Sequence, residues 1–216
     1  MFDNLRCVLG TIILAFNPLS QMELSAILGV PTVLISTTLR HLHSVILVPA
    51  DKSKEIRVFH KSFPDFLQDP QRCTDPRFYI DPTTNHGNIV ISCLKVLKKL
   101  KRNPCSLPPY VMNQDVPNLL QLLEDKLGSA VRYACRYWTQ HLRLSPISGN
   151  YATSVGVLVT RMLESAPPWI EVMSLENHLE EVIPSMNYLL DWLDKVSGSV
   201  SSPNMGGLFA NVATNR

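Results

Sequence analysis

Three segments near the N-terminus have the hydrophobic spacing of helices. Apolar residues crowd every face of the segment Asn4–Phe16, as in a helix that is buried on most sides. Ser20 is followed three residues later by Glu23, which is the spacing of a capping box and predicts a second helix that Gly29 ends. A third helix is predicted from Pro31 to Leu42, where apolar residues recur every three to four positions. Two helices joined by a tight turn that contains glycine make a helix-turn-helix.

Two β-prone runs, Val45–Val48 and Ile56–Phe59, follow these helices. The loop between them, PADKSKE, is typical of a hairpin connection. Three helices followed by a hairpin is the order of a winged-helix module, which we place at residues 1–75. The segment FHKSFPDFL comes next, followed by the connector QDPQRCTDPRFYIDP, whose three prolines forbid a long regular element.

From about Thr83 onward the pattern is helical only. Further helices are predicted over residues 117–127, 129–144, 153–164, 169–177 and 179–196, separated by clusters of Pro, Gly, Ser and Asn. We therefore expect a mainly α protein, in which a stack of antiparallel, superhelix-like helices occupies residues 81–196. No fixed repeat period is present. The Gly- and Ser-rich residues 197–216 are predicted to be a disordered tail.

The composition excludes a disordered chain and does not indicate a class of binding partner. Apolar residues make up 45 % of the chain, and the net charge of +2 is far from the basic excess of a dedicated nucleic-acid domain. Five scattered cysteines without a C-x-x-C pair fit reduced thiols in a cytoplasmic protein. The longest apolar stretch, Val8–Phe16, is far shorter than the roughly 20 residues that cross a bilayer, so no membrane span is expected.

The third predicted helix has few cations that could bind DNA, and the histidines near its end lack the spacing of metal ligands. Between Thr32 and His43 the only fixed cation is Arg40, whereas DNA affinity rests on several Lys or Arg side chains. His41 and His43 are two residues apart and so point to different sides of a helix, which does not favour a metal site. A second basic cluster is interpreted as a solvated helix end and consists of Lys95, Lys98, Lys99, Lys101 and Arg102.

Motifs for catalysis are missing from the 216 residues. The sequence has no G-x-S-x-G elbow, no H-E-x-x-H helix and no G-x-x-x-x-G-K-[ST] phosphate loop, so we expect no enzyme activity, no metal and no cofactor bound by this chain alone. Three tryptophans, Trp138, Trp169 and Trp192, are interpreted as helix-packing core. A ridge of Phe59, Phe63 and Phe66 is explained by ordinary core packing if KSFPDFL is helical.

Four segments, taken in order, resemble a known protein family. They are VLGTIILAFNPLSQMELSAILGV, LRHLHSVILVP, IRVFHKSFPDFLQDPQRCTDPRFYIDP and SAVRYACRYWTQHL. Together they resemble the region after the nucleotide-binding core of fungal NACHT-domain proteins, which are NLR-like members of the STAND signalling ATPases. The resemblance extends over about Leu5 to Leu193. It implies a winged-helix domain followed by a helical segment, and a role in signalling of the innate-immune type.

The resemblance also implies a candidate site residue. Phe59-His60-Lys61 looks like the family's MHD-like motif, with Phe in place of Met and Lys in place of Asp, and His60 is then the histidine that contacts the β-phosphate of ADP. Capping of the next helix, or pairing within the core, is the alternative role of His60. ADP or ATP binding is expected only with a NACHT core, which these residues do not include. Without that core, the surface around Phe59 and Phe63 should be partly exposed.

The expected function is a regulatory or interaction segment of an NLR-like STAND protein, as a truncated gene product or a fragment, with protein partners. The alternative is a freestanding winged-helix regulator that binds nucleic acid. A third reading is a protein-docking scaffold unrelated to STAND proteins.

Overall fold

The computed structural model describes residues 2–147, 149–164 and 166–199. Within them the chain forms two compact units. The first unit holds the chain up to Ser92 together with Gln140–Ser145, and the second holds Cys93–Thr139 and the chain from Pro146 on. This division differs from the expected domains 1–75 and 81–196, because most of helix α5 (Pro82–Leu97) belongs to the first unit.

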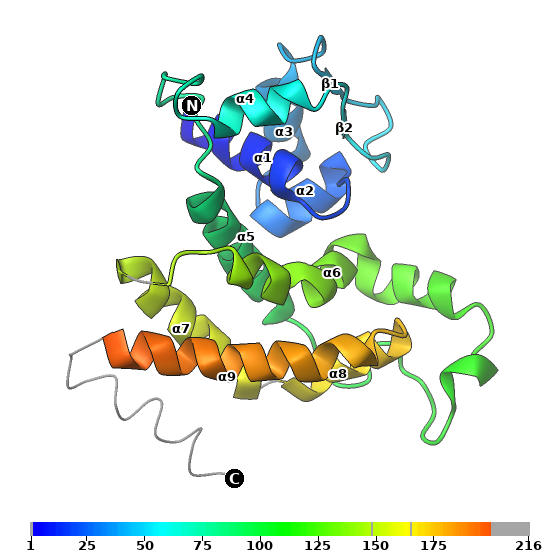
Figure 1. Ribbon diagram of the computed structural model, residues 1–216. Coiled ribbons are helices and arrows are strands. Elements are labelled where there is room, and N and C mark those ends of the chain that lie inside the picture. The colour runs from blue at the N-terminus through cyan, green and yellow to red at the C-terminus, as the bar shows by residue number, and fades with distance from the viewer. Residues whose placement is uncertain (1, 148, 165, 200–216) are drawn as a thin grey trace. The chain divides into compact units, whose positions relative to one another are not determined.

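The first unit begins with helices α1 (Phe2–Leu14), α2 (Gln21–Leu28) and α3 (Thr32–Leu39), which lie together in Figure 1. The predicted capping box at the start of α2 is confirmed. The Glu23 N–H donates to Ser20 Oγ at 3.1 Å, and the Ser20 N–H donates to the Glu23 carboxylate at 2.6 Å. Gly29 ends α2 in the left-handed conformation (φ 68°), as predicted. Helix α3 is shorter than predicted, because the Leu42 N–H closes a turn on the Leu39 carbonyl.

A small antiparallel sheet follows. Strand β1 (Ile46–Leu47) pairs with β2 (Arg57–Val58), with Ile46 opposite Val58. The hairpin is confirmed, although both strands are shorter than predicted. The residues after α1 add a third extended segment, because the Ile56 N–H donates to the Leu19 carbonyl at 2.9 Å. Strands β1 and β2 form the only sheet in the described part of the chain, and the other regular elements there are helices. The expectation of a mainly helical protein is therefore confirmed.

The first unit continues with α4 (Ser62–Gln68) and an irregular connector to α5. Pro64 lies in the first turn of α4, where its missing N–H costs nothing. Three aspartates organise the turns of the connector. The carboxylates of Asp69, Asp75 and Asp81 each accept a backbone N–H two or three residues further on, at 2.8–2.9 Å. The predicted absence of a long regular element here is confirmed.

The second unit is built from helices joined by irregular segments, and its described residues contain no strand. After the short helix η1 (Asn113–Asp115) it contains α6 (Leu119–Arg143) as far as Thr139, and the last residues of α6 belong to the first unit. The helices α7 (Gly149–Glu164), α8 (Ala166–Leu175), η2 (Leu179–Glu181) and α9 (Val182–Ser199) follow. Gly128 interrupts α6 with φ 71° and ψ 158°, which confirms the predicted break between residues 127 and 129. Helix α9 runs past the expected end at Val196 to Ser199, and the rest of the predicted disordered tail, 200–216, lies outside the described residues.

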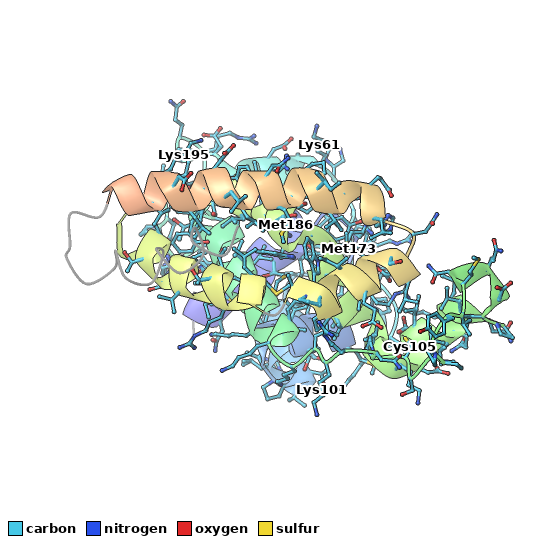
Figure 2. All side chains as sticks on the ribbon, turned by 90° about the horizontal axis from the view of Figure 1, so that it is seen from below. Lys61, Lys101, Cys105, Met173, Met186 and Lys195 are labelled. Carbon is cyan, nitrogen blue, oxygen red and sulfur yellow. The ribbon has the colours of Figure 1, made fainter. Side chains whose placement is uncertain are left out.

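Tryptophans form the centre of the second unit, as the sequence predicts. Trp138, Trp169 and Trp192 are all almost fully buried. The rings of Trp138 and Trp169 meet edge to face with centroids 5.8 Å apart, and the Trp169 indole N–H donates to the Cys135 carbonyl at 2.8 Å. Helix α9 runs alongside α7 and α8, and Met173 of α8 faces α9 in Figure 2.

All five cysteines are free, and burial raises the pKa of the Cys93 thiol to about 12, so it stays protonated and unreactive. In the described part of the chain, no single helix is both long enough and apolar enough to cross a bilayer. Helices α2 and α3 have sufficient length and apolar character only when they are taken together, and they are bent by 117° relative to each other.

Candidate functional site

His60 lies on the surface of the first unit, between the end of β2 and the start of α4. The Phe59 N–H donates to the Val45 carbonyl at 3.0 Å, which extends the pairing of the hairpin by one step. The His60 carbonyl then accepts the Phe63 N–H at 3.1 Å and opens the first turn of α4. His60 is therefore held by ordered backbone on both sides.

The two nitrogens of the His60 ring have different environments. The Ser62 N–H donates to Nδ1 at 3.1 Å, and the Ser62 hydroxyl lies 2.8 Å from the same nitrogen. Because Nδ1 accepts the Ser62 N–H, a neutral ring carries its hydrogen on Nε2. Ser62 is the first residue of α4, so this contact satisfies one of the helix's unpaired N–H groups. The capping contact uses Nδ1 only, and Nε2 keeps the capacity to donate to another group.

Three phenylalanines lie within six residues of His60 in the sequence and are at least partly exposed. Phe59 is 58 % exposed, Phe66 is 38 % exposed, and Phe63 is half-buried. The interpretation of these residues as ordinary core packing is therefore wrong for Phe59 and Phe66, because Phe59 precedes α4 and both side chains reach solvent. The exposure predicted around Phe59 and Phe63 is confirmed. The Arg72 guanidinium lies 5.8 Å from the centre of the Phe66 ring, which adds a cation at the edge of this surface.

The His60 ring has Ser62 as its hydrogen-bond partner. No carboxylate in the described residues pairs with His60, so no third group orients the ring as a general base. The exposed imidazole can donate one hydrogen bond to an anion, and the exposed Phe59 ring can be buried against an apolar partner. We define the His60 surface as Phe59, His60, Phe63 and Phe66.

The other residues singled out in the sequence lie elsewhere on the first unit. Arg40 follows α3, and one guanidinium nitrogen lies 3.3 Å from Nε2 of His41. His41 and His43 are both exposed, and the structure brings no third ligand to them within the described residues. Within α3 itself the most exposed large apolar side chain is Val33, at 67 %. This helix presents no lysine or arginine between Thr32 and Leu39.

The predicted basic cluster lies in the second unit and is exposed throughout. Lys95 is in the last turn of α5, but Lys98, Lys99, Lys101 and Arg102 follow the end of the helix rather than forming its last turns. The helix ends at Leu97 because the next N–H groups close tighter turns, such as that from Leu100 to the Leu97 carbonyl.

A buried histidine pair in the first unit was not foreseen. His86 of α5 and His141 in the last turn of α6 lie with their Nδ1 atoms 2.7 Å apart, and the Phe16 ring lies 4.6 Å from the His141 ring. Burial lowers the pKa of both rings, and that of His141, which is also opposed by the charge of His86, falls to about 3. The two residues are far apart in sequence, and no local pattern joins them.

One further group has metal-ligating side chains. The ligand atoms of His178, Glu180 and Glu181 lie within 4.8 Å of one another. The Arg136 guanidinium is 3.9 Å from the Glu181 carboxylate, and the Glu180 side chain is largely exposed. The positive charge of Arg136 would repel a metal cation bound here, so we interpret the group as paired surface charges.

Comparisons with known proteins add no relative. No protein-family model, no curated protein and no solved structure matches this chain.

Proposed function

We propose that this chain is a regulatory, non-catalytic segment of an NLR-like STAND signalling protein of the fungal NACHT type, acting in the cytoplasm. The observation that carries the proposal is the His60 surface, where an exposed histidine and an exposed phenylalanine follow a β-hairpin. The element order supports a winged-helix reading of the first unit. Three helices precede the hairpin, and the segment at Leu19 and Ser20 pairs with Glu55 and Ile56 as a third extended piece.

In this proposal the nucleotide belongs to a partner domain. A NACHT core, in the same polypeptide or in trans, holds ADP with its glycine-rich loop and lysine, and His60 donates from Nε2 to the β-phosphate. Phe59 is buried against the core when the two close together. The second unit, with its packed helices, serves as a superhelix-like relay to other signalling proteins. Loss of the phosphate contact then frees the His60 surface.

The alternative, a freestanding winged-helix regulator that binds nucleic acid, is less well supported. The helix that would enter the major groove, α3, carries Val33 and threonines on its exposed side and no cation. Base contacts specify a sequence, but phosphate contacts supply most of the affinity. An α3 without lysine or arginine cannot supply them.

A binding experiment in trans tests the proposal. The immobilised nucleotide-binding core of a fungal NACHT-domain protein, loaded with ADP, is titrated with the whole chain. We expect Phe59→Asp to weaken binding at least about tenfold, because a charge then replaces a ring that the core would bury. Val33→Asp is the matched control, since Val33 is also exposed on the first unit but lies on α3. It should bind like the native chain.

Two results would overturn the proposal. One is equal binding by the native chain and Phe59→Asp. The other is sequence-selective retention of DNA at about 150 mM salt that Arg40→Ala abolishes, which would support the nucleic-acid alternative instead.

A further inference from the structure

The second unit contains an open groove that the proposed function does not use. It has a volume of about 830 Å³, which lies within the range of roughly 300 to 1,000 Å³ typical of binding sites. One wall comes from the chain between α5 and η1, with Pro108, Pro109 and Val111. The other comes from α8 and η2, with Ile170 and Leu179. Proline and aliphatic side chains therefore form most of the lining.

Core packing and hydrogen bonds hold the base and the walls of the groove in place. Leu107 and Leu175 line it and also pack against the buried side chains of Cys105 and Leu123. The Asn113 amide donates to the Ser174 carbonyl at 2.7 Å and ties the two walls together. The Glu171 carboxylate accepts the Asn103 N–H at 2.8 Å, so the groove's only lining acid within the described residues is held by backbone.

The exposed segment that leads into this groove at Arg102 is basic. Arg102 lines the groove, and Lys98, Lys99 and Lys101 precede it on the same exposed segment. Within the described residues, none of these four side chains forms an ion pair. The chain as a whole has a net charge of only +2, so four unpaired cations within the five residues that lead into the groove at Arg102 are a local excess. A negatively charged partner would be attracted there.

We infer that this groove binds an acidic, apolar protein segment, with aliphatic or aromatic side chains seated between Val111 and Leu179 and carboxylates facing Lys98–Arg102. The inference is independent of the His60 surface, because all its residues belong to the second unit. A second copy of this chain is a poor occupant, since a symmetric contact would place the same cations against each other. Nucleic acid is also a poor occupant, because none of the described residues that line the groove has an aromatic ring on which bases could stack.

Selection from a library of random dodecapeptides displayed on phage tests the inference with the whole chain as bait. The enriched peptides should combine two or more large apolar residues with a negative net charge. The most enriched peptide, labelled with fluorescein, is then titrated with purified variants. Leu179→Asp should weaken its binding at least about tenfold, because a carboxylate then faces the peptide's apolar anchor and its acids.

Matched controls separate binding from folding. Leu179 is 48 % exposed, so its replacement leaves the core intact, and Leu120→Asp makes the same kind of change at a 71 % exposed position outside the groove. The double change Lys99→Glu/Arg102→Glu should also weaken binding about tenfold or more, as several charge contacts are reversed. Lys52→Glu/Lys54→Glu changes the net charge equally on the first unit and should have no effect.

The inference is overturned by enrichment of basic or purely polar peptides, or by no enrichment. It is also overturned if Leu179→Asp and Leu120→Asp bind the selected peptide equally. Tighter binding of single-stranded oligothymidine than of the selected peptide would also overturn the inference and assign the basic segment Lys98–Arg102 to nucleic acid. None of these results affects the expected binding of the chain to a NACHT core. Failure of the groove inference can therefore be distinguished from failure of the proposed function.

Discussion

Acidification from about pH 7 to about pH 5 should lower the free energy of unfolding by about 2 kcal/mol through His141 alone. His141 is fully buried, and its Nδ1 lies 2.7 Å from that of His86. One ring donates its Nδ1–H to the other, so a second proton would set two N–H groups against each other. Burial and this opposition lower the pKa of His141 to about 3, and burial lowers that of His86 as well.

The sign follows from where the protons bind. In the unfolded chain His141 has its ordinary pKa near 6.5. Below that pH the unfolded state therefore binds a proton at His141 that the folded state does not bind. The stabilisation is therefore complete above about pH 6.5 and is lost as the pH falls toward the folded value of about 3. The lowered pKa of His86 acts in the same direction.

Urea unfolding followed by circular dichroism at both pH values measures the effect. His141→Phe keeps a ring of similar size beside Phe16 but cannot titrate, so the loss between the two pH values should shrink by about 2 kcal/mol. His43→Ala, at an exposed position outside the buried pair, is the matched control. Identical pH dependence in the native chain and His141→Phe would contradict the neutral buried pair.

Replacing Trp138 by alanine should lower the free energy of unfolding of the second unit by about 3 to 5 kcal/mol. Its side chain is fully buried and meets Trp169 edge to face, so alanine leaves a cavity that rigid helices on both sides cannot fill. All three tryptophans belong to the second unit, so tryptophan fluorescence in urea reports its unfolding. A loss below about 1 kcal/mol would show that this region is loosely packed.

A comparison of two phenylalanine variants refines this result. The Trp169 indole N–H donates to the Cys135 carbonyl at 2.8 Å, whereas that of Trp138 has no hydrogen-bond partner in the described residues. Trp169→Phe loses a buried hydrogen bond, and Trp138→Phe removes an unsatisfied donor. Trp169→Phe should therefore be the more destabilising by about 1 kcal/mol. The opposite order would mean that the hydrogen bond contributes nothing.

Local signals predicted the elements well. The pair Ser20 and Glu23, the C-cap Gly29 and the break at Gly128 each act within a few residues, and the structure has all of them. Boundaries that depend on distant contacts were less accurate. Helix α8 begins before Trp169 because Pro167 and Pro168 are tolerated in its first turn.

Long-range arrangements could not be predicted in this way. His86 and His141 meet only because two helices bring them together, and nothing near either residue signals the other. The groove likewise combines Arg102–Asn113 with Pro167–Leu179, two stretches without a shared motif. At the His60 surface the sequence suggested both phosphate contact and helix capping. The structure supplies the capping contact through Nδ1, and phosphate contact remains a prediction for Nε2.

The rate of ADP release tests the central claim most directly. The chain is combined with the ADP-loaded core of a fungal NACHT-domain protein, and ADP dissociation is timed with the native chain, with His60→Ala and with His60→Asp. The aspartate can still cap Ser62 but has no hydrogen to donate to phosphate. Our account predicts that both variants release ADP about ten- to a hundredfold faster than the native chain, as expected for loss of one charge-assisted hydrogen bond. Equal release rates in all three, with circular dichroism unchanged, would contradict it and leave His60 as a helix cap alone.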